Sequence, residues 1–191
     1  MSRLWGHEAL LIRSNPVKPI SPGISGGPSK RNVHKVIKDP ALHVILYQPE
    51  IPANTGNIAR LCAAAEVRLH LVFPLGFKVD DRHLKRAGLD YWSEVDIRYH
   101  DSFKSFLGEW ERNEGRSLFA FSRHASVPYT EARVGHGDGL LFGKETRGLP
   151  PEILENYPAY RIPIWGRVRS LNLSTSVGIV VYHCLHRMGR F

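Results

Sequence analysis

Three polar segments of the sequence combine residue types that can bind and orient a ligand. The first, residues 49–60, ends at Arg60, whose planar guanidinium can bind a phosphate or a ribose hydroxyl. Asn54 or Asn57 can cap a helix that begins here, and Gly56 allows a close approach of the backbone. These structural roles leave Arg60 unexplained, because it lies about one turn into the expected helix beside apolar residues.

The second segment, residues 140–151, follows an apolar run that resembles a strand. A glycine at position 143 lets the backbone approach a ligand closely. Glu145 and Arg147 can take part in binding, or they can simply pair with each other at the surface.

The third segment, residues 167–176, is polar and basic. Ser170 or Asn172 can cap the last helix, but the need for one cap does not account for both. Each segment alone is moderate evidence for a ligand site. Their joint presence, each after a strand-like run, is strong evidence for a ligand site.

Several common sites are excluded by the sequence. No G-x-G-x-x-G motif follows a strand, so a dinucleotide site is unsupported. The residues around Lys144 fail as a P-loop, because Asp138 replaces the first glycine and Glu145 replaces the Ser or Thr. His183 and His186 can share a helix face but have no third ligand in view, and we therefore expect no metal site.

The elements that must position the three segments alternate between strands and helices. Short apolar runs predict strands at 43–47, 69–73, 95–99, 118–121, 140–142 and 161–164. Helical spacing of apolar residues, together with charge and proline signals, predicts helices near 58–65, 80–87, 103–110, 151–157 and 173–188.

This alternation predicts an α/β fold with a mostly parallel sheet and helices on both faces. Ligands of such sheets usually bind beyond the carboxyl ends of the strands. The loops after Tyr47, Phe121, Phe142 and Ile164 are therefore the expected site.

The N-terminal residues differ from the rest of the 191-residue chain. Residues 1–40 are rich in proline and glycine, and we expect a flexible basic extension before a domain at 41–191. The net charge of +8 favours a polyanionic partner, of which nucleic acid is the commonest. No apolar run approaches the roughly 18 residues of a membrane span, and two cysteines fit a reducing compartment. We expect a cytoplasmic protein, with organelle import through the extension as the less favoured alternative.

The motifs together resemble a known family, the SPOUT class of RNA methyltransferases that use S-adenosyl-L-methionine (AdoMet). They are most similar to those of the small bacterial enzymes that methylate the ribose 2′-oxygen of the tRNA wobble nucleotide. The resemblance extends over about residues 42–190. It rests on four stretches: 49–62, 86–91, 142–150 and 169–174. The stretch from Arg86 to Tyr91 is characteristic of the wobble enzymes.

The resemblance implies features that the residue pattern alone does not give. These are a C-terminal trefoil knot, a homodimer, bound AdoMet without a metal, and tRNA as substrate. Arg60 is the position often assigned to activation of the 2′-hydroxyl. The implied cofactor residues are Phe121, Gly143, Glu145, Ile162, Ser170 and Asn172. The expected substrate residues are Asn54, Arg86, Tyr91, Arg147 and Arg169, with Arg82, Lys85 and Arg167 as further phosphate contacts.

The chain also departs from the wobble enzymes. Thr175 replaces a usual Asn, His183 replaces a usual Glu, and residues 165–168 replace a loop that commonly includes Asp-Ser. The alternatives are therefore methylation of another tRNA position or of ribosomal RNA, and a non-catalytic RNA-binding relative. A nucleotide-binding oxidoreductase is a remote alternative, because the glycine-rich motif is absent.

Overall fold

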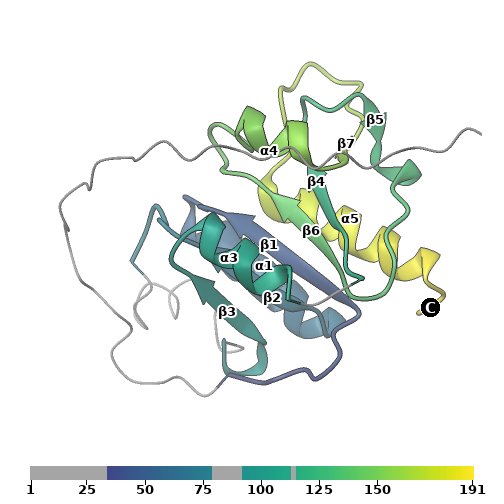
Figure 1. The fold of residues 1–191 in the computed structure, drawn as a ribbon. Helices are drawn as coiled ribbons and strands as arrows, with labels where there is room; N and C mark the ends of the chain where they lie inside the picture. The colour runs from purple at the N-terminus through teal and green to yellow at the C-terminus, as the bar shows by residue number, and fades with distance from the viewer. Residues whose placement is uncertain (1–33, 79–91, 113–114) are drawn as a thin grey trace, which may run out of the picture. The chain divides into compact units, whose positions relative to one another are not determined.

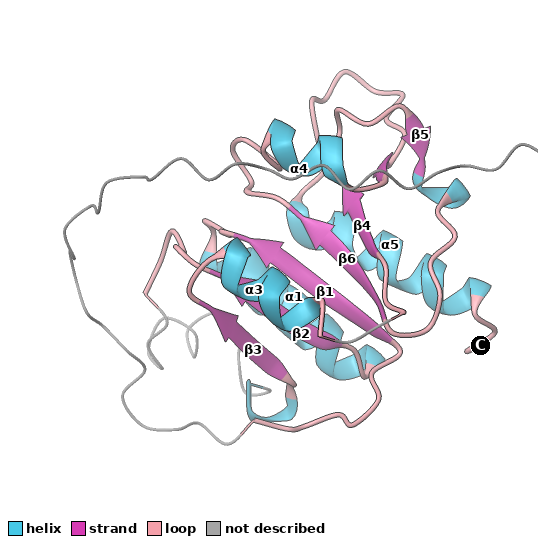
Figure 2. Ribbon diagram, viewed as in Figure 1, coloured by secondary structure: helices cyan, strands magenta, loops and turns pink. Residues whose placement is uncertain are grey.

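The computed structural model describes residues 34–78, 92–112 and 115–191. Strands and helices alternate along the chain, as predicted (Figures 1 and 2). The strands are β1 (Leu42–Tyr47), β2 (Arg68–Val72), β3 (Ile97–His100), β4 (Leu118–Phe121), β5 (Val127–Pro128), β6 (Asp138–Phe142) and β7 (Ala159–Arg161). The α-helices are α1 (Pro52–Ala65), α3 (Phe103–Trp110), α4 (Pro151–Asn156) and α5 (Leu173–Arg187), and two short 3₁₀-helices are Trp92–Glu94 and Tyr129–Glu131.

The described strands form one sheet in the order β3-β2-β1-β6-β4-β7-β5. Every pairing in it is parallel. Phe142 pairs with Leu46 on one side and with Phe121 on the other. The carboxyl ends of β1, β6 and β4 therefore lie at the same edge of the sheet, which brings together the loops that follow them.

Helices cover both faces of the sheet, because apolar side chains alternate in direction along the strands. Leu42, Val44 and Leu46 belong to the core beneath α1 and α5. Ile45 belongs to a second core with Phe106 of α3 and residues of α4. Figure 1 shows α3 in front of the sheet and α5 behind it. The predicted fold class is confirmed.

Some predicted boundaries are wrong. The helix expected from about residue 58 begins at Pro52, with Ile51 as N-cap and no side-chain cap, so neither Asn54 nor Asn57 caps it. The strand expected at 161–164 lies at 159–161 instead. The strand expected at 95–99 lies at 97–100, and β5 was not predicted. The helix predicted at 80–87 lies outside the described residues.

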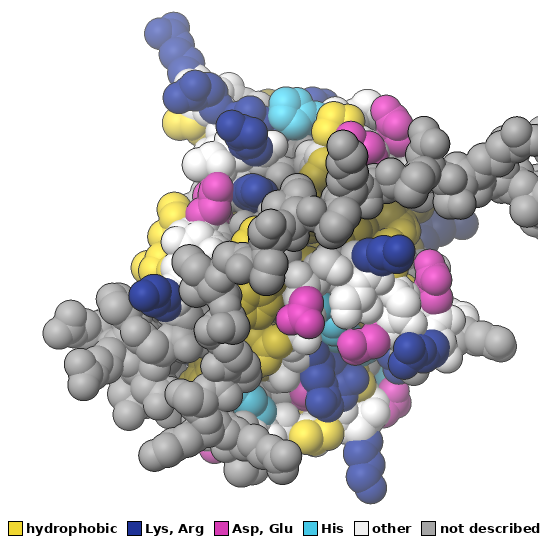
Figure 3. Space-filling model, turned by 60° about the vertical axis from the view of Figure 1, so that its left-hand side comes forward, with side chains coloured by type: hydrophobic (Ala, Val, Ile, Leu, Met, Phe, Trp, Pro, Cys, Tyr) yellow, Lys and Arg dark blue, Asp and Glu magenta, His cyan; other side chains and the backbone are white. Residues whose placement is uncertain are grey.

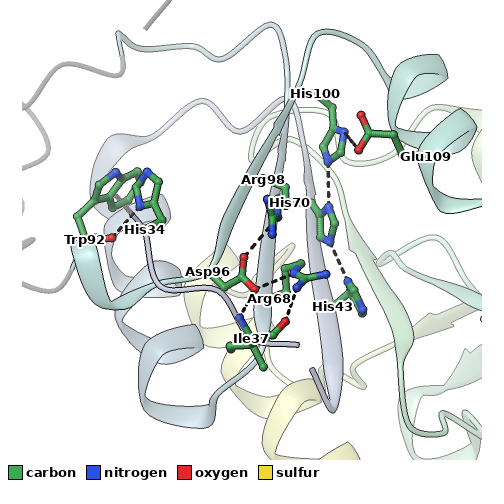
Figure 4. Close-up of polar contacts among 10 residues, drawn as sticks. All are labelled: His34, Ile37, His43, Arg68, His70, Trp92, Asp96, Arg98, His100 and Glu109. Atoms are coloured by element: carbon green, nitrogen blue, oxygen red, sulfur yellow. Dashed lines mark hydrogen bonds and ion pairs between the residues drawn. The ribbon is translucent and has the colours of Figure 1, made fainter. Parts of the chain in front are cut away.

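The described part of the predicted extension is hydrogen-bonded to the domain near β3 (Figure 4). His34 Nδ1 lies 3.0 Å from the Trp92 carbonyl oxygen. The Ile37 N–H donates to the carboxylate of Asp96 at 2.8 Å, and Asp96 is 1% exposed. Residues 34–37 thus provide partners for buried polar groups. No helix in the part of the chain described is long and apolar enough to span a membrane.

Candidate active site

A cavity of about 330 Å³ lies at the carboxyl ends of β4 and β6. The loops expected to form a site, those after β1, β4, β6 and Ile164, all contribute to it. Its lining consists of Ile51, Asn54 and residues 121–124, 142–146, 148, 162, 164, 170–173 and 176.

The cavity brings together the residues expected to bind the cofactor. Phe121, Gly143, Glu145, Ile162, Ser170 and Asn172 all line it, and Asn54 joins them. Ser122, Arg123, His124 and Lys144 also line it, although the sequence analysis did not single them out as site residues. Their position could have identified them, because they closely follow the ends of two predicted strands, where ligand sites of parallel sheets are expected.

Glu145 ties the loop after β6 to the beginning of α1. One of its carboxylate oxygens accepts from the Glu50 N–H at 2.8 Å. The other accepts from the Ile51 N–H at 3.2 Å and from Asn54 Nδ2 at 3.0 Å. The partial positive charge at a helix N-terminus favours a carboxylate there. Glu145 therefore fixes the shape of one cavity wall.

Asn54 extends this network to the beginning of α5. Its side-chain oxygen accepts from Asn172 Nδ2 at 2.9 Å, and Asn54 is 5% exposed. Asn172 Oδ1 in turn accepts from the Ser174 N–H at 2.8 Å, so Asn172 is the predicted cap of α5. The side-chain amide of Asn54 was expected to contact substrate. In the structure its nitrogen donates to Glu145 and its oxygen accepts from Asn172.

Glu50 makes a second link between the same two loops. Its carboxylate accepts from the Thr146 N–H at 3.0 Å and from the Thr146 hydroxyl at 2.7 Å. The hydroxyl bond is the main reason that the pKa of Glu50 lies below its usual value. This role of Glu50 could not be predicted from the sequence, because its partner lies 96 residues away.

Gly143 is required by the chain itself. Lys144 forms an antiparallel bridge with Gly148, and the Gly148 N–H donates to the Lys144 carbonyl at 2.8 Å. A Cβ on Gly143 would overlap backbone atoms of Gly148 and Leu149. The sequence predicts a close approach of a ligand at this glycine, whereas in the structure the glycine first accommodates residues 148–149.

Replacing Gly143 by alanine should therefore open the turn at residues 143–149. We expect a loss of about 1–3 kcal/mol in the free energy of unfolding, as for overpacked sites, and weaker AdoMet binding. Urea unfolding and calorimetric titration measure the two effects. Gly108→Ala is the matched control, because a Cβ there meets no atom within 4 Å. Unchanged stability and AdoMet affinity in Gly143→Ala would contradict the steric argument.

The predicted arginines that the structure describes lie outside the cavity lining. Arg60 is exposed on α1, six residues beyond Asn54 and thus about 9 Å further along the helix axis. Arg147 and Arg169 are exposed, and their neighbours Thr146 and Ser170 do line the cavity. Arg86 and Tyr91, with Arg82 and Lys85, lie outside the described residues.

Comparison with known proteins gives consistent results. The SpoU rRNA Methylase family model matches residues 41–182. A protein of Escherichia coli K12 named tRNA (cytidine(34)-2'-O)-methyltransferase is 44% identical over 151 residues, covering 78% of this chain and 94% of the relative.

Solved structures agree with these matches. One, described as giving structural insights into the 2-OH methylation of C/U34 on tRNA, is 51% identical with a TM-score of 0.74, covering 78% of this chain and 97% of that chain. An AdoMet-bound rRNA methyltransferase of Sinorhizobium meliloti is 27% identical with a TM-score of 0.70, covering 78% of this chain and 57% of that one. The chain therefore belongs to the SpoU rRNA methylase family.

Proposed function

We propose that this protein transfers a methyl group from AdoMet to the ribose 2′-oxygen of the wobble nucleotide in the tRNA anticodon loop. The observation that carries the proposal is the cavity, which gathers all six residues expected to bind the cofactor. The names of the E. coli relative and of the similar solved structure support nucleotide 34 of tRNA as the substrate. Family membership also implies the C-terminal trefoil knot.

The cavity has the chemistry that AdoMet requires. Phe121 and Phe142 stack with ring centroids 5.2 Å apart, and they line the cavity with Ile162, which gives apolar surface for an adenine. The backbones of residues 143–146 and 170–173 supply polar groups. Glu145 adds a carboxylate and Lys144 an ammonium, which suit a ligand that carries both signs of charge. Bound AdoMet would supply a methyl group already activated by its sulfonium.

The protein's contribution is then to position the ribose and to deal with the hydroxyl proton. Arginine is a poor base, because its pKa exceeds about 12. We therefore assign to Arg60 the orientation of the 2′-hydroxyl and the stabilisation of negative charge that develops on its oxygen. Because Arg60 does not line the cavity of its own chain, we propose a homodimer in which it reaches the cavity of a second copy.

The surroundings of the cavity suit an RNA substrate. Arg147 and Arg169 are exposed beside residues that line it, and Arg167 is exposed two residues before Arg169. Figure 3 shows Lys and Arg side chains gathered at the top of the face drawn, at the height of α4 and β7 in Figure 1. Such arginines contact phosphates, while the 2′-hydroxyl distinguishes RNA from DNA. Arg86 and Tyr91 remain predicted substrate contacts, and we propose that the reaction takes place in the cytoplasm.

Incubation of the purified protein with labelled AdoMet and unmodified tRNA tests the proposal. We expect one 2′-O-methyl group at nucleotide 34, located by nuclease digestion and mass spectrometry. A methyl group at another tRNA position or in ribosomal RNA would support the proposed reaction but show that nucleotide 34 of tRNA is not the substrate. AdoMet binding without methyl transfer to any RNA would contradict the enzymatic function and favour a non-catalytic relative.

A further inference from the structure

Trp165 is the most exposed large apolar side chain in the described part of the chain. It is 92% exposed, whereas Trp92 and Trp110 are 8% and 7% exposed. The large apolar surface of an indole stabilises a fold or a complex only when it is buried. A partner that covers this surface would therefore gain that stabilisation on binding.

The position of Trp165 relates it to the candidate active site. It begins the segment 165–169, whose flanking residues Ile164 and Ser170 both line the cavity. The segment has no regular secondary structure and all five of its residues are exposed. The segment that carries the exposed indole therefore leaves the cavity lining at Ile164 and returns to it at Ser170.

The charges around Trp165 indicate what covers it. Arg167 and Arg169 are exposed in the same segment, and Arg123 and Lys144 line the cavity. Proteins that bind single-stranded nucleic acid combine aromatic side chains, on which bases stack, with cations that contact the phosphates.

We infer that Trp165 stacks on a nucleobase of the RNA substrate next to the ribose that enters the cavity. This inference rests on the proposed function, and it identifies a substrate-positioning residue in the segment that departs from the pattern of the wobble enzymes. A second copy of the chain is a less suitable cover, because the same segment exposes Arg167 and Arg169 and charged residues are depleted in interface cores. The proposed homodimer would bring the region around Arg60 of a second copy to the same cavity, so contact of Trp165 with that copy is the competing outcome, which the oligomeric state tests.

Equilibrium binding of labelled tRNA to Trp165→Ala and Trp165→Phe tests the inference. Loss of one stacked base should weaken binding of tRNA by Trp165→Ala roughly 5- to 150-fold, while Trp165→Phe keeps most of the affinity. The Michaelis constant for tRNA should rise accordingly, with the affinity for AdoMet unchanged. Val168→Ala is the matched control, because Val168 is 62% exposed in the same segment but has no aromatic ring.

Three results would overturn the inference. They are unchanged tRNA affinity in Trp165→Ala, an equal loss of AdoMet affinity, and a change of oligomeric state measured by light scattering. The last would assign Trp165 to an interface between copies. Because the experiment measures tRNA binding, it tests the role of Trp165 whether or not the wild-type protein transfers methyl groups. Failure of the proposed function would instead appear as wild-type protein that methylates no tRNA.

Discussion

Replacement of Arg60 by alanine should lower the rate of methyl transfer by about 10²- to 10³-fold, the range for removing one group that stabilises negative charge developing on an oxygen. The affinity for AdoMet should stay near that of the wild type, because Arg60 does not line the cavity of its own chain and its assigned role is toward the ribose hydroxyl. Single-turnover methylation of tRNA and calorimetric titration with AdoMet measure the two quantities. Equal loss of both would exclude the assigned role.

A lysine at this position should not restore the rate, because its ammonium lacks the planar fork of donors that can hold a hydroxyl and a phosphate together. Arg112→Ala is the matched control. Arg112 is also exposed, but it follows α3 on the opposite face of the sheet from α1. Its replacement should leave the rate of methyl transfer unchanged.

Mixed dimers test whether Arg60 acts across an interface. Arg60→Ala keeps the cofactor cavity, and Gly143→Ala keeps Arg60 but is expected to bind AdoMet weakly. If Arg60 serves the second copy, a refolded equal mixture contains one complete site in each mixed dimer, and about a quarter of wild-type activity returns. If Arg60 serves its own chain, no mixed dimer has a complete site and no activity returns.

The central strands were predictable because each is a short apolar run between polar segments. β1, β2, β4 and β6 are buried over most of their length, and their positions were predicted to within two residues. β5 and β7 are two and three residues long and partly exposed, so they leave little signal. Ile162 and Ile164 looked like strand residues, but they line the cavity, so their apolar character serves a ligand site.

The site was predictable in outline because parallel strands bring their carboxyl ends to one edge. The sequence indicated which loops meet, but not how they are joined. Glu145 lies 91 residues from Asn54, and Asn172 lies 118 residues from it. Pairings over such separations depend on the order and register of the strands, which one sequence does not reveal. The same limit applies to three buried histidines on neighbouring strands.

His43, His70 and His100 form a hydrogen-bonded row across β1, β2 and β3 (Figure 4). His43 Nδ1 lies 2.8 Å from His70 Nε2, and His70 Nδ1 lies 2.9 Å from His100 Nε2. Each histidine is at most 7% exposed. His100 Nδ1 faces the carboxylate of Glu109 at 3.7 Å, which favours a proton on that nitrogen.

That proton determines which nitrogen donates and which accepts in each hydrogen bond of the row. If His100 carries its proton on Nδ1, its Nε2 must accept from His70 Nδ1–H, and His70 Nε2 must accept from His43 Nδ1–H. All three neutral imidazoles should then be Nδ1–H tautomers, which ¹⁵N NMR near pH 8 can detect. His43 Nε2 is left as a buried acceptor without a partner among the described residues. Nε2–H tautomers would contradict this assignment.

Burial lowers the pKa of all three histidines. For His43, the charges of Arg116 and Arg68 add to burial and lower the pKa to about 3. Arg98 also lowers the pKa of His70 and His100, whereas Glu109 opposes the shift at His100. The folded protein therefore holds these histidines neutral at a pH where the unfolded chain, with a pKa of about 6.5, is protonated.

The free energy of unfolding should consequently fall as the pH is lowered from 6.5, because the unfolded state binds more protons. Each histidine that stays neutral contributes a slope of up to about 1.4 kcal/mol per pH unit, so the three together approach about 4 kcal/mol per unit. Urea unfolding between pH 8 and pH 5 measures this slope. His43→Leu should reduce this slope by up to about 1.4 kcal/mol per pH unit, the contribution of one histidine. Ile45→Val is the control at the next position of β1 that faces the same core, and it should lower the free energy of unfolding equally at every pH. A slope unchanged by His43→Leu would show that proton uptake on acid unfolding does not come from the row.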